Sequence, residues 1–452
     1  MRPIAYSLLV ISSLWVGGMA RAASRPHYGG TLHISMQAAP ASLDPAQAND
    51  LAQFEILPLI MDSLTVLDEQ SQPRPSLAIA WNSETGDQRW HFTLRSGVTF
   101  SDGNPVSPEA VAASLRAVNP AWKIVAMSDG IVIECDTRYA SLPAELALPR
   151  NAIAKRDGGK MIGSGPFIIS QWQPRRSLTL TARSDHWAGQ PFLASIDISF
   201  GQNLRDQLVA LDLGKADVAS VAPEQAHLLA SEGRPLQTSS PSELVALVFA
   251  HDTQSPEEAK LRDALSLSID RGLLNRVVLQ NGGEPAGSLL PNWMTGYGFL
   301  FSTGQDLTRA QQERADIPQS PLWKLGFDSN DSVAQLLSER IVLNARDAGL
   351  RVQATSSGPG DVRLVRLPLS SSDPWIALKE IARNFGIPQP VSHGQSLDDL
   401  YASESAMLQA RRIIPLLHLR PACVVSKTVK NWSEAPDGRW RLTDVWLSTE
   451  QP

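Results

Sequence analysis

The pattern of apolar and polar positions over residues 90–118 predicts a strand, a turn, a second short strand and a capped helix. The segment begins with strict alternation, as a half-buried strand does, and its first apolar positions are Trp90, Phe92 and Leu94. The Asp102-Gly103 dipeptide favours a turn, because glycine accepts a positive φ without strain. Ser107 can then cap a helix that starts at Pro108, a residue suited to the first helical position.

Two longer segments in the second half of the chain have apolar residues at helical spacing. The first, residues 255–270, opens with a capping box and has proline at its first helical position. The second, residues 333–349, has an apolar stripe and ends at a glycine. Strand-like and helical segments alternate irregularly along the chain, which predicts mixed α/β lobes.

The first 22 residues have the pattern of a secretory signal peptide. Arg2 precedes an apolar run over residues 4–16, and Ala20-Arg21-Ala22 forms an A-x-A cleavage site. The apolar run is shorter than the roughly 20 residues that span a bilayer, so cleavage is favoured over a membrane anchor. No cysteine lies near the cleavage site to carry a lipid. We therefore expect an exported protein of the periplasm that is not embedded in the membrane.

The composition excludes several classes of function. A chain of 452 residues is long enough for about two to four domains. The formal net charge is −6 and no basic block is present, so nucleic acid and anionic membranes are poor partners. The sequence contains none of the common zinc, phosphate-loop or nucleophile motifs, and its eight histidines form no i,i+4 pair. We therefore expect no enzymatic activity, no cofactor and no metal site.

The sequence leaves the state of its two cysteines open. Cys135 ends a strand-like run and Cys423 lies near the C-terminus. They could pair in an oxidising compartment or could both be small buried side chains. Spacing alone does not decide, because a disulfide requires a specific geometry.

Residues 90–115 resemble the signature of the family 5 extracellular solute-binding proteins, the peptide, dipeptide and nickel receptors of bacterial ABC importers. That signature reads W-x-F-x-L-R-x-G-V-x-F-x-D-G-x-P-[VL]-x-x-E-x-V-x-x-S-L. Residues 42–45 (SLDP) are similar to a loop of the family, residues 163–167 (GSGPF) to a crossover, and residues 262–271 to a later helix. The resemblance extends over residues 28–447.

The resemblance implies an α/β fold of the type II periplasmic binding protein class, with two hinged lobes and an inserted smaller domain. Lobe I is expected from residues 23–53, 161–242 and 420–452, the small domain from 54–160, and lobe II from 243–419. The chain is expected to cross the hinge near residues 240–250 and 415–425. The ligand is expected to bind between the lobes.

Candidate ligand contacts follow an apolar strand at residues 362–367. In the polar segment Ser370-Ser371-Ser372-Asp373-Pro374-Trp375, Asp373 could meet a ligand amine and Trp375 could form an aromatic wall. The alternative is a capped helix start, with Asp373 as N-cap and Pro374 at the first position.

Further candidates lie in two loops. Trp293 and Tyr297 belong to a Gly/Pro-containing loop that the resemblance places by the mouth of the cleft, although packing onto the lobe is an equal alternative. Asp44 in the SLDP loop is a candidate contact or a turn residue.

The resemblance implies a periplasmic receptor that captures a peptide-like or other small polar solute and delivers it to an inner-membrane ABC permease. The family is mostly monomeric, so a monomer is expected. The second lobe of the family usually carries a long aromatic tract, and the corresponding segment here, residues 376–412, is short. The alternative function is therefore a scaffold with a trimmed pocket that serves as a protein-interaction or sensory module.

Overall fold

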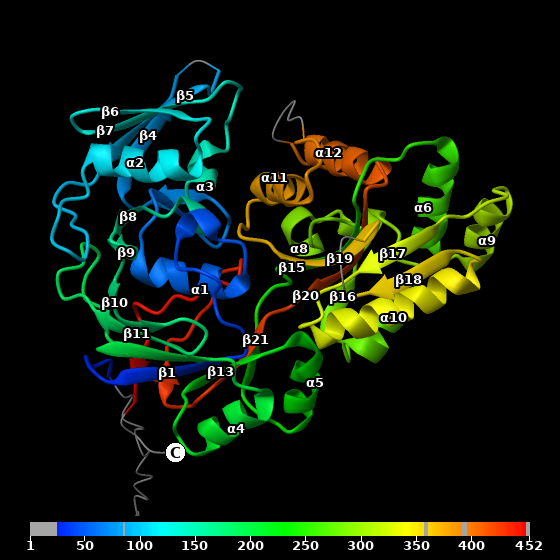
Figure 1. Cartoon of the computed structure of the whole chain (residues 1–452). Coiled ribbons are helices and arrows are strands. Elements are labelled where there is room, and N and C mark those ends of the chain that lie inside the picture. Colours follow the sequence, from blue (N-terminus) through cyan, green and yellow to red (C-terminus); the bar gives the residue numbers. More distant parts are fainter. Residues whose placement is uncertain (1–24, 85, 357–359, 391–395, 449–452) are drawn as a thin grey trace, which may run out of the picture.

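The computed structural model describes residues 25–84, 86–356, 360–390 and 396–448, and Figure 1 shows two bodies next to each other. The signal peptide expected at residues 1–22 lies outside the described residues. Across the described segments, no helix combines the length and the apolar character needed to cross a membrane.

A seven-stranded mixed sheet forms the centre of the first body, which we call lobe I. Strand β1 is parallel to both of its neighbours, and the other pairs are antiparallel. In spatial order the strands are β10 (Phe167–Gln173), β11 (Ser177–Ala182), β12 (Ser195–Phe200), β1 (Thr31–Met36), β13 (Val218–Val221), β21 (Ala422–Val425) and β14 (Leu236–Thr238). The accompanying helices are η1 (Pro45–Gln47), α1 (Leu51–Ile60), α4 (Leu204–Asp212) and α5 (Pro223–Ser231).

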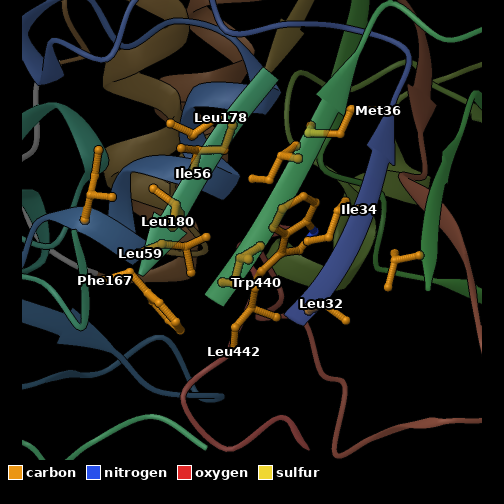
Figure 2. Close-up of a cluster of buried hydrophobic side chains, with 14 of the residues drawn as sticks. Leu32, Ile34, Met36, Ile56, Leu59, Phe167, Leu178, Leu180, Trp440 and Leu442 are labelled. Carbon is orange, nitrogen blue, oxygen red and sulfur yellow. The ribbon is translucent and has the colours of Figure 1, made fainter. Parts of the chain in front are cut away.

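The core of lobe I joins segments from both ends of the chain. Alternate residues of β1 are fully buried, as its sequence pattern requires, and they belong to one apolar cluster with helix α1. Figure 2 shows part of this cluster, including Leu32, Ile34, Met36, Ile56, Leu59, Trp440 and Leu442. Because Trp440 and Leu442 pack here, lobe I is discontinuous in sequence.

A four-stranded antiparallel sheet forms the small domain above lobe I (Figure 1). Its strands in spatial order are β4 (Ala78–Ser83), β5 (Arg89–Leu94), β7 (Gly130–Glu134) and β6 (Lys123–Ala126), and α2 (Pro108–Val118) packs on it. The predicted strand and capped helix are confirmed, since Ser107 Oγ accepts a hydrogen bond from Ala110 N. The predicted second strand is only an isolated bridge between Thr99 and Pro105.

Smaller elements connect the small domain to lobe I and to the second body. They are β2 (Thr65–Leu67), β3 (Pro73–Pro75), α3 (Leu142–Glu145), η2 (Pro149–Asn151), β8 (Ala154–Asp157) and β9 (Lys160–Gly163). The glycine-containing segment after β9 is a tight crossover, as the sequence favoured. A Cβ on Gly165 would lie 2.5 Å from the carbonyl carbon of Ile60, so this close approach requires glycine.

A six-stranded sheet forms the second body, which we call lobe II. Its strands in spatial order are β16 (Gly283–Pro285), β20 (Ile413–Leu419), β15 (Glu243–Phe249), β19 (Val362–Pro368), β17 (Leu322–Gly326) and β18 (Arg351–Thr355). One apolar cluster joins the sheet to α6 (Pro256–Ser268), α9 (Leu307–Ala315) and α10 (Ser332–Asp347). A second cluster joins it to α8 (Asn292–Thr295), α11 (Pro374–Phe385) and α12 (Leu397–Gln409). The two helices predicted from residues 255–270 and 333–349 are confirmed by α6 and α10.

The chain passes between the lobes at residues 239–242, which link β14 to β15, and at residues 420–421, which link β20 to β21. The strands of the three larger sheets fall inside the segments expected for lobe I, the small domain and lobe II, whereas β9 spans the expected boundary at residues 160 and 161. Helix α1 spans the expected boundary at residues 53 and 54, yet it packs in the lobe I core because its apolar residues face that sheet. The exact domain boundaries stay a prediction.

The two cysteines are both free. Cys135 is half-buried at the end of β7 in the small domain, whereas Cys423 is buried in β21 of lobe I. Burial raises the pKa of the Cys135 thiol to about 11 and raises that of Cys423 further. Both thiols therefore stay protonated at neutral pH and have little nucleophilic character.

Candidate functional site

Helix α11 lies where lobe II meets the small domain, and the candidate Asp373 stands at its start. Asp373 Oδ1 accepts a hydrogen bond from Ile376 N at 3.0 Å, and Pro374 occupies the first helical position. This geometry is the capped helix start that the sequence offered as the alternative role. Burial raises the pKa of Asp373, although the backbone hydrogen bonds oppose that shift. Contact between Asp373 and a ligand amine stays a prediction.

Two of the three aromatic candidates are packed within lobe II. Trp375 is 7% exposed and Tyr297 is 8% exposed, and both belong to the second apolar cluster of that lobe. The Tyr297 hydroxyl donates to Glu404 Oε2 at 2.9 Å. Trp293 is more exposed, and its Nε1 donates to the Pro241 carbonyl at 2.8 Å, so it ties α8 to the crossing between the lobes. Their contact with a solute stays a prediction.

Asp44 lies on lobe I, whereas the other four candidates lie on lobe II. Its side chain caps η1 through Ala46 N at 3.0 Å and pairs with Arg156, whose Nη2 lies 2.6 Å from Asp44 Oδ1. The loop lines a cavity of about 750 Å³ together with β9 and the edge strand β10. Asp44 and the other four candidates therefore belong to different lobes, and their contact with one solute stays a prediction.

The face of α11 toward the small domain carries charged side chains that the sequence did not single out. Arg150, from η2, pairs with Glu145 of its own domain and with Glu380 of α11. The Tyr139 hydroxyl donates to the second oxygen of Glu145 at 2.9 Å, and Ser370 Oγ donates to the second oxygen of Glu380. The side chains of Glu145, Arg150 and Glu380 are 2%, 12% and 9% exposed, so this ion network is removed from solvent.

The network favours the charged form of Glu145. Burial alone raises the pKa of Glu145, but the guanidinium groups of Arg150 and Arg383 outweigh burial and the net pKa is lowered. Burial lowers the pKa of Lys379, whose Nζ lies 3.9 Å from the centre of the Tyr139 ring. Among the described residues, no group of three or more His, Cys, Asp or Glu side chains is arranged to hold a metal ion.

Two buried hydroxyl groups near the junction of the lobes have no hydrogen-bond partner among the described residues. Ser242 Oγ lies in the first crossing, and Ser372 Oγ lies in the loop that leads into α11. Both residues are at most 3% exposed. Buried polar groups are normally hydrogen-bonded, so these two hydroxyls stand out, and their contact with a bound molecule is a prediction.

His418 is a buried histidine on β20 next to the second crossing. Its Nε2 donates to the Leu289 carbonyl at 3.1 Å, and burial lowers its pKa from 6.5 to about 4. The folded chain thus keeps His418 neutral at a pH where the unfolded chain protonates it. Stability from this residue is complete above about pH 6.5 and is lost as the pH falls toward 4, a loss of about 3 kcal/mol.

We expect the acid-induced loss of stability that His418 causes to disappear when this residue is replaced. Unfolding free energies of the natural chain and of the His418→Gln variant are measured with urea at about pH 7 and about pH 4.5. The natural chain should lose about 2–3 kcal/mol more than the variant between these two conditions. Equal losses in both proteins would show that His418 does not titrate as its burial requires.

Comparison with known proteins identifies the family. The family model described as "Bacterial extracellular solute-binding proteins, family 5 Middle" matches residues 72–357. The periplasmic murein peptide-binding protein MppA of Escherichia coli (strain K12) is 24% identical over 303 residues, which cover 57% of this chain and 56% of that protein. The probable D,D-dipeptide-binding periplasmic protein DdpA of the same organism is 25% identical over 325 residues, 64% of this chain and 63% of that protein. These matches thus span less than two thirds of either relative.

Solved structures share the fold over nearly the whole chain. The periplasmic binding protein DppA of Helicobacter pylori, in complex with the peptide STSA, superposes with a TM-score of 0.79 at 17% identity and covers 94% of this chain and 99% of that chain. NikA of Staphylococcus aureus, in complex with Ni(L-His)2, has a TM-score of 0.76 at 17% identity and covers 92% and 100%. The predicted two-lobed α/β fold of periplasmic binding proteins is therefore confirmed. The chain belongs to the bacterial extracellular solute-binding proteins of family 5.

Proposed function

We propose that this chain is the substrate-binding protein of a bacterial ABC importer. It binds a peptide-like or other small polar solute between its lobes in the periplasm, as a monomer, and delivers the solute to an inner-membrane permease. It is a binding protein and not an enzyme. The observation that carries this proposal is the family match over residues 72–357 on a two-lobed fold. The named relatives, a murein peptide-binding and a probable D,D-dipeptide-binding protein, support a peptide-like solute.

The connections between the lobes support a receptor that closes around a solute. The lobes are joined at residues 239–242 and 420–421, and a pair of short crossings permits rigid-body closure. The unpartnered hydroxyls of Ser242 and Ser372 lie near this junction and can donate to or accept from a polar solute. A solute that contacts both lobes stabilises the closed form by its differential contacts.

A thermal-shift screen tests the proposal. The mature chain is mixed with dipeptides, murein-type peptides, nickel chelates and sugars, and native mass spectrometry examines whether the gently purified chain retains a solute. A solute present at about 100 times its Kd should raise the free energy of unfolding by about 2.7 kcal/mol and hence raise the Tm. No rise with any of these classes, and no retained solute, would contradict the proposal.

Two serine variants locate the solute. Ser372→Ala removes a buried hydroxyl that has no partner in the described chain, so the Tm of the free protein should change little. Its affinity for the solute found in the screen should fall about fivefold, the effect of one lost hydrogen bond. Ser338→Ala is the matched control, because Ser338 is an equally buried, unpartnered serine inside helix α10. The same loss of affinity in both variants would remove Ser372 from the site.

The ion network on α11 favours the alternative function, a scaffold for protein interaction or sensing. Arg150 and Glu380 join the small domain directly to lobe II. A protein partner recovered by the tagged mature chain, together with no response in the solute screen, would support this alternative over transport.

A further inference from the structure

A cavity on lobe I lies outside the region between the lobes. Strand β10 is at one edge of the seven-stranded sheet, at the opposite end from β14 and β21, which lead into the two crossings. Figure 1 shows β9 and β10 on the side of lobe I away from lobe II. The loop at Asp44, the β8–β9 hairpin and β10 line the cavity of about 750 Å³. We call it the β10 groove, and its volume is in the range of ligand sites, roughly 300–1,000 Å³.

Apolar side chains form one wall of the β10 groove. Ile168, Ile169 and Trp172 of β10 and Met161 of β9 line it, and all four are half-buried. Ile169, Trp172 and Met161 also pack against the lobe I core, so the wall is held in place from behind. The wall can therefore contact apolar side chains of a bound molecule without rearrangement.

The backbone of β10 offers hydrogen bonds along the same wall. An edge strand has unpaired N–H and C=O groups on its outer side. Among the described residues, no strand pairs with the outer side of β10. A bulge between Ile169 and Gln171 leaves residues 167–169 as a regular stretch of ladder beside the apolar wall. An extended peptide can add to such a stretch through main-chain hydrogen bonds.

Two carboxylates at the β10 groove already have cationic partners. Asp44 pairs with Arg156 at 2.6 Å. Asp102 pairs with Lys155 at 2.7 Å, and this hydrogen-bonded ammonium lowers the pKa of Asp102 to about 2. Because each carboxylate is matched by a cation, the two repel an incoming anion less than free carboxylates would.

Three further cations beside the β10 groove have no such partner. Lys160 lines the groove, and Arg175 and Arg176 form the turn that follows β10. All three are exposed, and within the described part of the chain none of them forms an ion pair. They outnumber Asp157, the exposed carboxylate of the neighbouring hairpin. The groove thus has a basic rim on a chain of net charge −6, which favours an acidic partner.

We propose that the β10 groove binds an extended acidic peptide segment of a partner protein. The segment pairs its backbone with residues 167–169 and places apolar side chains against Ile169 and Trp172. Its carboxylates lie near Lys160 and Arg175, where charge-assisted hydrogen bonds are the strong ones. This site is separate from the region between the lobes and does not depend on the proposed transport function.

A labelled peptide tests the proposal. The probe is a fluorescein-labelled octapeptide of alternating glutamate and valine that also carries a benzophenone group, and fluorescence anisotropy with the mature chain measures its affinity. The probe should bind, and its photo-cross-links should fall within residues 156–174. Peptides with lysine in place of glutamate, or with proline in place of valine, should bind about tenfold more weakly or worse. The first loses charge complementarity and the second cannot donate to a ladder.

Charge reversal at the rim tests the role of the three free cations. The triple variant Lys160→Glu, Arg175→Glu and Arg176→Glu should lower the affinity for the probe about tenfold or more. A matched control reverses three exposed cations elsewhere on the chain, namely Arg205, Arg351 and Lys427. The control has the same net charge and should lower the affinity less than about threefold, because salt screens distant charges.

A single substitution inside the β10 groove is milder for the fold. Ser170 is exposed, lines the groove and hydrogen-bonds through its hydroxyl to that of Thr181. Ser170→Glu puts a carboxylate in the path of the peptide and should lower the affinity about fivefold or more. Thr181→Ala removes the same hydroxyl contact and should leave the affinity unchanged. Circular dichroism and a cooperative melting transition show that each variant is folded.

Several outcomes would overturn the inference. They are no binding of the acidic probe, cross-links outside residues 156–174, and equal losses in the rim variant and its control. Displacement of the probe by a solute known from the thermal-shift screen would also overturn it, because that solute is expected between the lobes. A chain that binds no solute in the screen can still bind the probe, so failure of the transport proposal is a separate result.

Discussion

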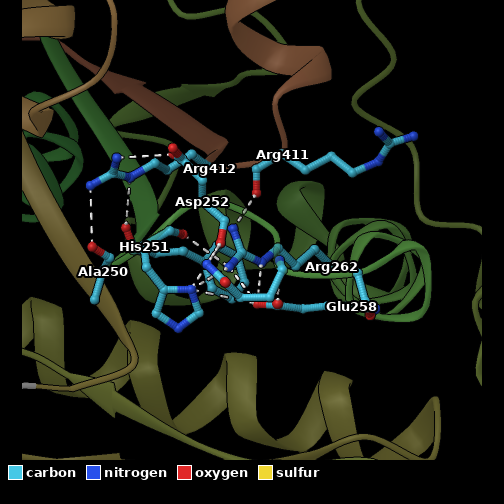
Figure 3. A network of polar contacts seen from close by, with 10 residues as sticks. Ala250, His251, Asp252, Glu258, Arg262, Arg411 and Arg412 are labelled. Carbon is cyan, nitrogen blue, oxygen red and sulfur yellow. Dashed lines mark hydrogen bonds and ion pairs between the residues drawn. The ribbon is translucent and has the colours of Figure 1, made fainter.

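Replacement of Arg262 by alanine is expected to lower the free energy of unfolding by about 3–5 kcal/mol, because it removes one partner of a buried ion pair. The Arg262 side chain is fully buried in lobe II. Its Nε donates to Glu258 at 3.1 Å, and its two terminal nitrogens donate to the carbonyls of Arg411 and His251 at 3.2 and 3.0 Å (Figure 3). Its guanidinium carbon also lies 4.0 Å from the centre of the Phe249 ring.

The size of this effect follows from what remains after the substitution. Glu258 loses its cation, and two backbone carbonyls lose donors at a site that water reaches poorly. Arg262→Lys is also expected to be destabilising, since one ammonium group cannot reproduce a planar fork with donors in three directions. Urea unfolding at neutral pH measures both losses.

The neighbouring residue provides the control for Arg262. Asp263 pairs with Arg411 at 2.8 Å, but both side chains are about two-fifths exposed. Asp263→Asn should therefore change the free energy of unfolding by less than about 1 kcal/mol. A loss for Arg262→Ala as small as that of Asp263→Asn would show that the buried network contributes little.

Local sequence signals predicted the elements of this fold well. The caps at Ser107 and Ser255 start α2 and α6 as expected, because a capping side chain bonds to a backbone N–H three residues later. The alternation of apolar and polar residues likewise predicted the strand at residues 89–94. Both signals are reliable because they depend only on residues close together in the sequence. The same local rules predicted an N-cap role for Asp373 as the alternative to ligand contact, and the structure has that cap.

The contacts between distant segments could not be read from one sequence. Arg150 and Glu380 are 230 residues apart, and neither stands in a pattern that indicates its partner. A charged residue on an amphipathic helix normally faces solvent, so the sequence did not indicate that Glu380 is buried. Tyr297 looked like an exposed loop aromatic because its acceptor, Glu404, is 107 residues away. The family resemblance predicted the two-lobed architecture. It did not predict these side-chain contacts, because they depend on how distant segments pack.

Glu404 is the second residue whose replacement should strongly lower the free energy of unfolding. The same experiments also show which role Tyr297 has. Glu404 is fully buried in α12, and one of its oxygens accepts from the backbone N–H groups of Leu289 and Leu290 while the other accepts from the Tyr297 hydroxyl. Glu404→Ala leaves three buried donors without an acceptor, so the free energy of unfolding should fall by about 3–5 kcal/mol.

Glutamine at the same position separates hydrogen bonding from packing. Glu404→Gln keeps one oxygen for the two backbone N–H groups, and its amide can donate to the Tyr297 oxygen, so the loss should be about 1 kcal/mol. Tyr297→Phe removes only the hydroxyl and should cost a similar amount, while the affinity for any solute stays unchanged if Tyr297 acts within the lobe II core. A Tyr297→Phe variant with natural stability and weakened solute binding would instead place this hydroxyl against the ligand. The comparison thus decides between the two roles that the sequence left open for Tyr297, because the packing role acts on stability and the contact role acts on affinity.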